Sequence, residues 1–232
     1  LSIGAGGQVF APGLLKDIAS AFPDAVLGIG YGMTECGGTI CAIGGNELAQ
    51  HLTAAGRVLP SVDIQIVDEL GEVVAPNQEG EVLIGGAMLM SQYCGLEEAT
   101  ADMLRGGWLR SGDIGRLDEH GYLHVVDRKK NIVISGGENI SCSEVESAMV
   151  EMADVADAAA FSVPDDRLGE KLVMAVVPRS GTPIAPALLQ AHLAQRLAAY
   201  KIPQQFVFVD ELPRNASGKV LRHQLQARCQ PQ

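Results

Sequence analysis

Short β-branched runs separated by turn residues occupy the middle of this chain, and they constrain its fold more than any other feature. They lie between about residues 58 and 126 and are bounded by glycine, proline and asparagine, at 62–67, 73–74, 81–84 and 122–126. Runs of this length and composition are typical of strands joined by turns. The middle of the chain is therefore predicted to form a small β-rich subdomain.

A different pattern precedes these runs. Residues 12–22 carry apolar side chains at helical spacing, and residues 26–29 form a short apolar run before a glycine-rich segment. This order predicts a helix followed by a buried strand. We therefore expect an α/β unit that ends in a glycine-rich loop.

The last hundred residues alternate between helical and strand patterns. Helices are predicted over residues 143–152, 186–199 and a short stretch after Ser217, and strands at 158–163, 172–177 and 205–209. The first helix has a serine cap at its start, with Glu146 three residues later. The prediction is an α/β and α+β protein with three parts, at 1–127, a junction at 128–130 and a compact α+β domain at 131–232.

Charge and cysteine content exclude several classes of protein. The formal net charge of -11 disfavours a nucleic-acid binder or a protein held on anionic membranes, because both partners attract basic surfaces. The five cysteines are scattered and never spaced as C-x-x-C, so neither a disulfide framework nor a zinc site is indicated. No apolar run is long enough for a transmembrane segment. We expect a soluble protein of a reducing cytoplasm.

The segment YGMTE at residues 31–35 follows the first predicted strand. Its glycine permits close backbone approach, its threonine hydroxyl can bond a phosphate oxygen, and its carboxylate can hold Mg²⁺. Taken alone, a glycine-rich turn capped by Thr34 is an equally good interpretation.

Two further segments carry groups suited to a sugar. The segment WLRSGD ends in Asp113, whose carboxylate can accept hydrogen bonds from two vicinal ribose hydroxyls, although such an aspartate is more often a turn residue. Arg128 opens a basic triplet and has a planar fork of five donors, although a triplet of this kind is usually a solvated surface.

The last two segments contain glycine beside a functional group or a turn. SGGENI at 135–140 lies between an apolar run and a predicted helix, where paired glycines let a slender chain pass close, or form an ordinary hairpin turn. NASGK at 215–219 presents Lys219 near the C-terminus, as a point charge for a reaction centre or as a solvated lysine. It is not a Walker A loop, because Pro213 and Val220 replace the required residues.

Taken in order, these five segments resemble the adenylate-forming superfamily, which includes acyl-CoA synthetases, peptide-synthetase adenylation domains and firefly luciferase. The resemblance extends over residues 4–225. The YGMTE segment, the SGGENI turn and the SGKVLR ending look like acyl-CoA synthetases more than like the other two groups. The fold is therefore expected to be the end of the large adenylate-forming domain, followed by the small C-terminal domain.

The resemblance implies a role for each nucleotide-facing residue. Tyr31 would lie near adenine, Thr34 would contact the α-phosphate and Glu35 would bind Mg²⁺. Asp113 and Arg128 would hold the ribose hydroxyls of ATP or AMP.

The same resemblance assigns the remaining site residues. Lys219 would bridge the attacking carboxylate and the α-phosphate, and Lys130 would be the hinge on which the small domain rotates. Gly136 and Gly137 would line the pantetheine tunnel of coenzyme A. The acyl pocket is expected at Gly6, Gly7, Gly30, Gly32 and Met33.

The activity implied is ATP-dependent, Mg²⁺-assisted activation of a fatty or other hydrophobic acid as its adenylate, with transfer to CoA. Two alternatives stay open, an enzyme that loads a carrier protein and a truncated, non-catalytic binding module. The family's loop for the β- and γ-phosphates would lie upstream of Leu1, so the chain alone is expected to be inactive. A homodimer is also left open.

Overall fold

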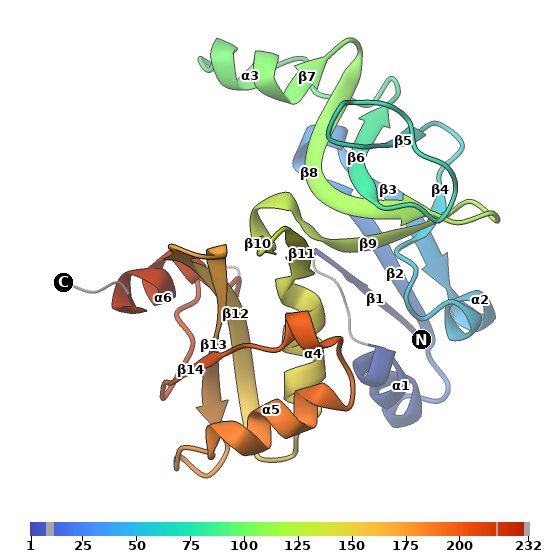
Figure 1. The fold of residues 1–232 in the computed structure, drawn as a ribbon. Helices are drawn as coiled ribbons and strands as arrows, with labels where there is room; N and C mark the ends of the chain where they lie inside the picture. The colour runs from blue at the N-terminus through green and yellow to red at the C-terminus, as the bar shows by residue number, and fades with distance from the viewer. Residues whose placement is uncertain (8–11, 217, 230–232) are drawn as a thin grey trace. The chain divides into compact units, whose positions relative to one another are not determined.

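The computed structural model describes residues 1–7, 12–216 and 218–229. The chain divides into two compact units, Leu1–Lys129 and Lys130–Gln232 (Figure 1). This division falls inside the segment 128–130 that the sequence analysis placed between its two domains, and the role of that segment as a hinge stays a prediction. In the described part of the chain, no helix is long and apolar enough to cross a membrane.

The first unit is built on a sheet that has nine strands within the described residues. Their order is β1-β2-β3-β4-β9-β8-β6-β5, with β7 beside β8, and only β1 and β2 run parallel. The bounds are β1 Ser2–Gly6, β2 Val26–Met33, β3 Gly38–Gly44, β4 Gly56–Val58, β5 Asp63–Val67, β6 Gly80–Gly85, β7 Leu104–Arg105, β8 Trp108–Leu117 and β9 Tyr122–Arg128.

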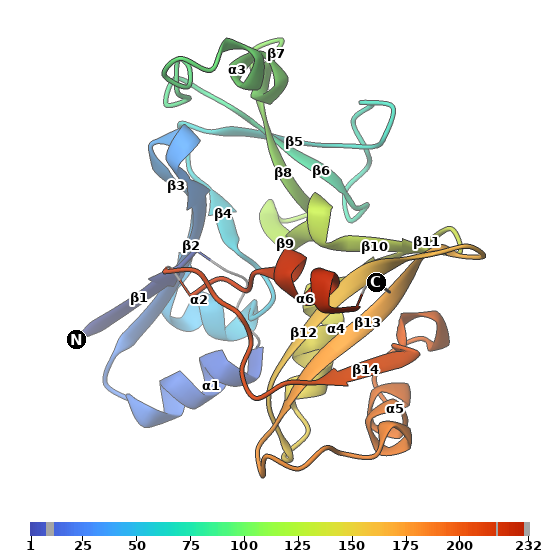
Figure 2. The ribbon, with the colours of Figure 1, turned by 90° about the vertical axis from the view of Figure 1, so that its left-hand side faces the viewer.

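Helices cover one face of the first three strands (Figure 2). The helical segments of this unit are α1 Pro12–Ala21, the 3-10 turn η1 Thr34–Cys36, α2 Gly45–Gln50 and α3 Glu97–Met103. Leu15 of α1 and Leu48 of α2 pack in one core cluster with Leu27 and Ile43 of the sheet. The other face of β2 carries glycine at positions 28, 30 and 32, because alternate residues of a strand point to opposite faces. That face therefore has almost no side chains.

A second core lies in the β-rich part of the unit. Isoleucines and leucines from several strands pack together, among them Ile40, Ile66, Ile84 and Leu123. The predicted strands at 62–67, 81–84 and 122–126 are confirmed, whereas residues 73–74 form no named strand and contribute only an isolated bridge between Val73 and Val67.

The first buried strand is longer than its apolar run predicts. Tyr31, Gly32 and Met33 belong to β2 and not to a loop, because β3 pairs with β2 as far as Met33↔Gly38. Only residues 34–36 leave the strand, as the 3-10 turn η1.

The second unit contains a smaller sheet, with β14 beside β13 in the order β11-β10-β13-β12. Its strands are β10 Ile132–Ser135, β11 Glu138–Ser141, β12 Val155–Asp165, β13 Gly169–Pro178 and β14 Gln205–Phe208; its helical segments are α4 Cys142–Val150, α5 Pro186–Ala194, the 3-10 turn η3 Ala199–Lys201 and α6 Arg222–Cys229. The 3-10 turn η2 Lys129–Asn131 lies where the two units join. Along β12, Ala158 and Ala160 pack with α4 and α5, whereas Ala159 and Phe161 pack with α6. The sheet is thus buried on both faces.

The helices of this unit were predicted in the right places but with shifted ends. The cap of α4 is Ser141, whose side chain accepts a hydrogen bond from the backbone N–H of Glu144 at 3.2 Å, and not Ser143. Helix α5 ends at Ala194, earlier than expected, and the last helix begins only at Arg222.

Candidate active site

Three of the residues singled out in the sequence meet around one buried carboxylate. Asp113 on β8 is 3% exposed, and its Oδ1 lies 3.0 Å from Nε of Arg128 on β9. The hydroxyl of Tyr31 donates to Oδ2 of Asp113 at 2.6 Å. Burial, followed by the neighbouring Asp113 carboxylate, raises the pKa of Tyr31, so the phenol stays protonated and a donor at neutral pH.

The strand register brings two of these residues together. Asp113 lies directly opposite Arg128 in the antiparallel pair of β8 and β9, and a bulge follows between Ile114 and Gly115. A side chain at Gly115 would place its Cβ 2.7 Å from the carbonyl oxygen of His124, so glycine is required where the strands approach. The contact therefore depends on a register that spacing along the sequence does not reveal.

Glu35 is held from two sides by a segment that the sequence analysis did not single out. The hydroxyl of Tyr93 donates to Oε1 of Glu35 at 2.8 Å, and the backbone N–H of Met90 donates to its carbonyl oxygen at 2.7 Å. The hydrogen bond to Glu35 is the largest cause of a raised pKa at Tyr93. Tyr93 is itself fixed by Thr100, whose Oγ1 accepts from the Tyr93 backbone N–H at 2.9 Å.

The donor set around Glu35 fits a magnesium ion that arrives with phosphates. Among the residues the structure describes, no group of three or more histidine, cysteine, aspartate or glutamate side chains could hold a metal by itself. Protein sites for Mg²⁺ commonly use one or two carboxylates, with water and substrate phosphates completing the octahedron. A single glutamate anchored through one oxygen agrees with that arrangement and not with an all-protein cage.

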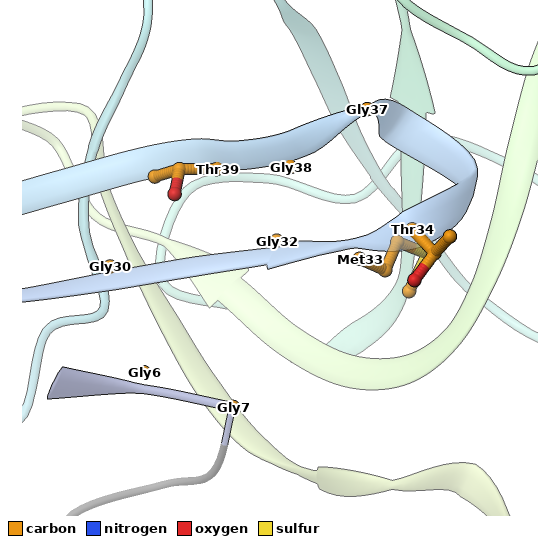
Figure 3. A pocket seen from close by; sticks show the side chains of 9 residues that line it. All are labelled: Gly6, Gly7, Gly30, Gly32, Met33, Thr34, Gly37, Gly38 and Thr39. Atoms are coloured by element: carbon orange, nitrogen blue, oxygen red, sulfur yellow. The ribbon is translucent and has the colours of Figure 1, made fainter.

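A cavity of about 550 Å³ lies on the side-chain-poor face of β2. Figure 3 shows Gly6 and Gly7 at the end of β1, with the other lining residues on the hairpin of β2 and β3. Its lining consists of Gly6, Gly7, Gly30, Gly32, Met33, Thr34, Gly37, Gly38 and Thr39. All five positions predicted for an acyl pocket are among them. Gly37, Gly38 and Thr39 were not predicted, because the YGMTE motif ends at Glu35.

Glycine is required in this wall by strand packing as well as by the space it leaves. A Cβ at Gly32 would lie 1.9 Å from the carbonyl oxygen of Gly38, and a Cβ at Gly30 would lie 3.0 Å from Cγ2 of Thr39. Contacts below about 3 Å are not tolerated without movement of the backbone or side chain. The wall of the cavity is therefore backbone, and Thr39 provides one of its few side chains.

The second unit holds the remaining predicted residues. Lys219 is exposed in a tight turn, where its N–H donates to Oδ1 of Asn215 and its carbonyl oxygen accepts from the N–H of Asn215, both at 2.9 Å. Gly136 and Gly137 form the hairpin turn between β10 and β11, with φ of 61° and 86°. Two consecutive left-handed residues are typical of such turns. Lys130 lies in η2.

Family models match both units. The AMP-binding enzyme family matches residues 1–94, and the AMP-binding enzyme C-terminal domain matches residues 144–219.

Curated relatives are CoA ligases. A feruloyl-CoA synthase of Amycolatopsis sp. is 40% identical over 214 residues, which are 91% of this chain and 44% of that protein. A 2-succinylbenzoate–CoA ligase of Geobacillus kaustophilus is 39% identical over 195 residues, which are 84% of this chain and 40% of the relative. The chain thus spans less than half the length of these relatives.

Solved structures agree with the sequence relatives. The o-succinylbenzoate CoA synthetase of Bacillus subtilis, in complex with its acyl-adenylate intermediate, has a TM-score of 0.89 and 36% identity over 97% of this chain and 46% of its own. The amide bond synthetase McbA of Marinactinospora thermotolerans has a TM-score of 0.87 and 33% identity over 98% of this chain and 46% of its own. With both units matched by family models, relatives and solved structures, the chain belongs to the AMP-binding enzymes.

Proposed function

We propose that the full-length protein activates an aromatic carboxylic acid with ATP and transfers the acyl group to coenzyme A. The observation that carries the proposal is the position of the cavity, whose wall includes Thr34 at the end of the strand that presents Tyr31 to Asp113. An acid in the cavity and a nucleotide at Tyr31 would then meet at Thr34.

In the first half-reaction, a carboxylate oxygen attacks the α-phosphorus of ATP, and the bond to the bridging oxygen breaks to release pyrophosphate. Asp113, held by Arg128, accepts hydrogen bonds from the ribose hydroxyls, and the Thr34 hydroxyl donates to the α-phosphate. Lys219 supplies positive charge where negative charge accumulates. Its exposed ammonium forms none of the ion pairs found among the described residues, which suits a group that acts on an external anion.

Magnesium would be held by the Glu35 carboxylate and the phosphates, and when bound it neutralises charge on the nucleotide. In the second half-reaction, the thiol of coenzyme A attacks the acyl carbonyl and AMP leaves. Gly136 and Gly137 have no Cβ, so their turn offers bare backbone to the pantetheine arm. Rotation of the second unit about Lys130 would exchange the two half-reactions.

An aromatic acid is a narrower substrate class than the fatty or other hydrophobic acid expected from the sequence. The two curated relatives described above are named for feruloyl and 2-succinylbenzoate, and both groups contain a benzene ring. A wall of glycine backbone also suits a flat ring, because planar peptide groups can approach it closely. The cavity of about 550 Å³ is within the usual range for small-molecule sites.

The acceptor distinguishes this proposal from its alternatives. The full-length protein would be given ATP, Mg²⁺ and hydroxycinnamic, benzoic and fatty acids, with CoA, a phosphopantetheinyl carrier protein or a primary amine as acceptor. Mass spectrometry should detect an aryl-CoA thioester. Transfer only to the carrier protein, or only to the amine, would show that this group and not CoA is the acceptor. Formation of no acyl product would favour a non-catalytic module.

A further inference from the structure

The turn that carries Lys219 is tied to the sheet of the second unit by an arginine outside the residues assigned so far. Nη1 of Arg214 donates to the carbonyl oxygen of Gly218 at 2.7 Å, and its Nη2 donates to Oδ2 of Asp157 at 2.6 Å. One guanidinium therefore joins the residue before Lys219 to strand β12. Its planar fork can bind two acceptors in a fixed geometry, which a lysine cannot do.

The turn is also closed on itself. Arg214 and Val220 form an isolated bridge, and the N–H of Gly218 donates to the carbonyl oxygen of Asn215 at 2.9 Å. On either side of the turn, Leu212 and Leu225 are buried in one core cluster, and Leu225 belongs to α6. The backbone at Lys219 is thus fixed at its flanks by packing and at its tip by hydrogen bonds.

The side chain of Lys219 differs from this fixed base. Lys201 and Lys129 each form an ion pair with a glutamate, whereas no ion pair found among the described residues includes Lys219. The constrained backbone limits the volume that the ammonium can reach, and the absence of an ion pair among the described residues leaves the ammonium available to an external anion. Such a restriction matters for a group that must meet a developing charge within a few tenths of an ångström.

We infer that Arg214 is a positioning residue for Lys219, and that Asp157 acts through Arg214. This inference rests on the proposed function, because it assumes that Lys219 acts in adenylate formation. Arg214 would contact neither the acid nor ATP. It would hold the Gly218–Lys219 peptide so that the ammonium reaches the α-phosphate.

The second unit offers a matched control. Nε of Arg196 lies 2.8 Å from Oε2 of Glu151, and its Nη1 donates to the carbonyl oxygen of His192 at 3.0 Å. Arg196 therefore also joins a carboxylate to a backbone carbonyl, but it lies after α5 and away from the Lys219 turn in the sequence. Replacing it removes the same types of bond without touching that turn.

The test measures the two half-reactions separately in the full-length protein. Arg214→Gln, Asp157→Asn, Arg196→Gln and Lys219→Ala would be compared in acid-dependent ATP–pyrophosphate exchange and in transfer of the acyl group from preformed acyl-adenylate to CoA. Arg214→Gln should slow exchange between about tenfold and about a hundredfold, the scale of a misplaced catalytic group. The rate of acyl transfer to CoA by Arg214→Gln should stay within about twofold of wild type. Arg196→Gln should keep both its exchange rate and its transfer rate within about twofold of wild type.

Two further readouts exclude a merely structural role. Hydrogen exchange over residues 214–221 should accelerate in Arg214→Gln, while the peptides of β12 and β13 keep their protection. The double variant Arg214→Gln/Asp157→Asn should exchange pyrophosphate no more slowly than Arg214→Gln alone, because coupled residues are not additive.

Equal loss in both half-reactions, or an Arg214→Gln rate equal to that of Arg196→Gln, would overturn the inference. If Lys219→Ala loses exchange while Arg214→Gln keeps it, only the role of Arg214 is refuted. If Lys219→Ala keeps exchange, the proposed role of Lys219 is refuted and this inference with it.

Discussion

Replacing each of the three glycines on one face of β2 by alanine should change the stability of the protein by a different amount, although neighbouring glycines of this set are only two residues apart. A Cβ at Gly28 would meet the Ile43 carbonyl oxygen at an ordinary 3.5 Å, whereas a Cβ at Gly32 would lie 1.9 Å from a backbone oxygen. At Gly30 the nearest atom, at 3.0 Å, is the methyl group of the exposed Thr39, which can rotate. The new methyl group therefore makes an ordinary van der Waals contact at position 28, meets a movable side chain at position 30 and collides with backbone at position 32.

The magnitudes follow from those neighbours. Gly28→Ala should be neutral or stabilising by up to about 1 kcal/mol, because alanine restricts the unfolded chain. Gly32→Ala should cost about 3 kcal/mol or more, since overpacking usually costs 1–3 kcal/mol and here no rotamer relieves the collision. Gly30→Ala should cost about 1 kcal/mol and reduce acid binding, because its methyl group lies at the cavity wall.

Urea unfolding of the full-length variants, followed by circular dichroism, measures the stability differences, and the KM for the acid measures the effect on the cavity. From most to least stable, the order of the variants should be Gly28→Ala, Gly30→Ala, Gly32→Ala. A Gly32→Ala protein as stable as Gly28→Ala would refute the argument that strand packing requires glycine at this position.

The remaining predictions concern the carboxylate of Glu35, for which we propose a role in Mg²⁺ binding, and the buried thiol of Cys41. Tyr93→Phe removes the hydrogen bond to Glu35 and should raise the Mg²⁺ concentration for half-maximal ATP binding by about threefold to tenfold, measured by calorimetry. Tyr122→Phe is the control, because it removes a tyrosine–glutamate hydrogen bond outside the site. The same shift in both variants would contradict the prediction. Burial raises the pKa of Cys41 from 9.0 to about 12, so the unfolded thiol ionises first and stability should fall as pH rises from 9 toward 12. The free energy of unfolding across this range should depend less on pH in Cys41→Ala than in wild type. Cys94→Ala, which replaces an exposed cysteine, should keep the wild-type pH dependence. A wild-type curve in Cys41→Ala would contradict the prediction.

Elements with a strong apolar period could be predicted from the sequence, and glycine-rich ones could not. Helix α1 and strands β5, β6 and β9 were predicted because their apolar residues recur at a helical spacing or in short runs. Strands β1 and β3 were missed. Their residues include four glycines, which erase the alternation that identifies a strand and are normally evidence for a turn.

The candidate site shows a similar limit. Motifs identified Tyr31, Asp113 and Arg128 one by one, but Tyr31 lies 82 residues before Asp113 on a strand that does not pair with β8, and Asp113 meets Arg128 only through the register of β8 and β9. Tyr93 was missed because a tyrosine in an irregular loop has no spacing pattern, and only tertiary structure brings its hydroxyl to Glu35. Local sequence thus predicts which chemical groups are present, whereas register and loop packing decide which of them touch.

Acid-dependent ATP–pyrophosphate exchange by the full-length protein would show whether the protein forms an acyl-adenylate and from which class of acid. Hydroxycinnamic, benzoic and fatty acids would be compared, with Lys219→Ala in parallel. We expect exchange that requires an aromatic acid and falls by orders of magnitude in Lys219→Ala. Exchange that is absent with every acid, or that survives unchanged in Lys219→Ala, would contradict this expectation.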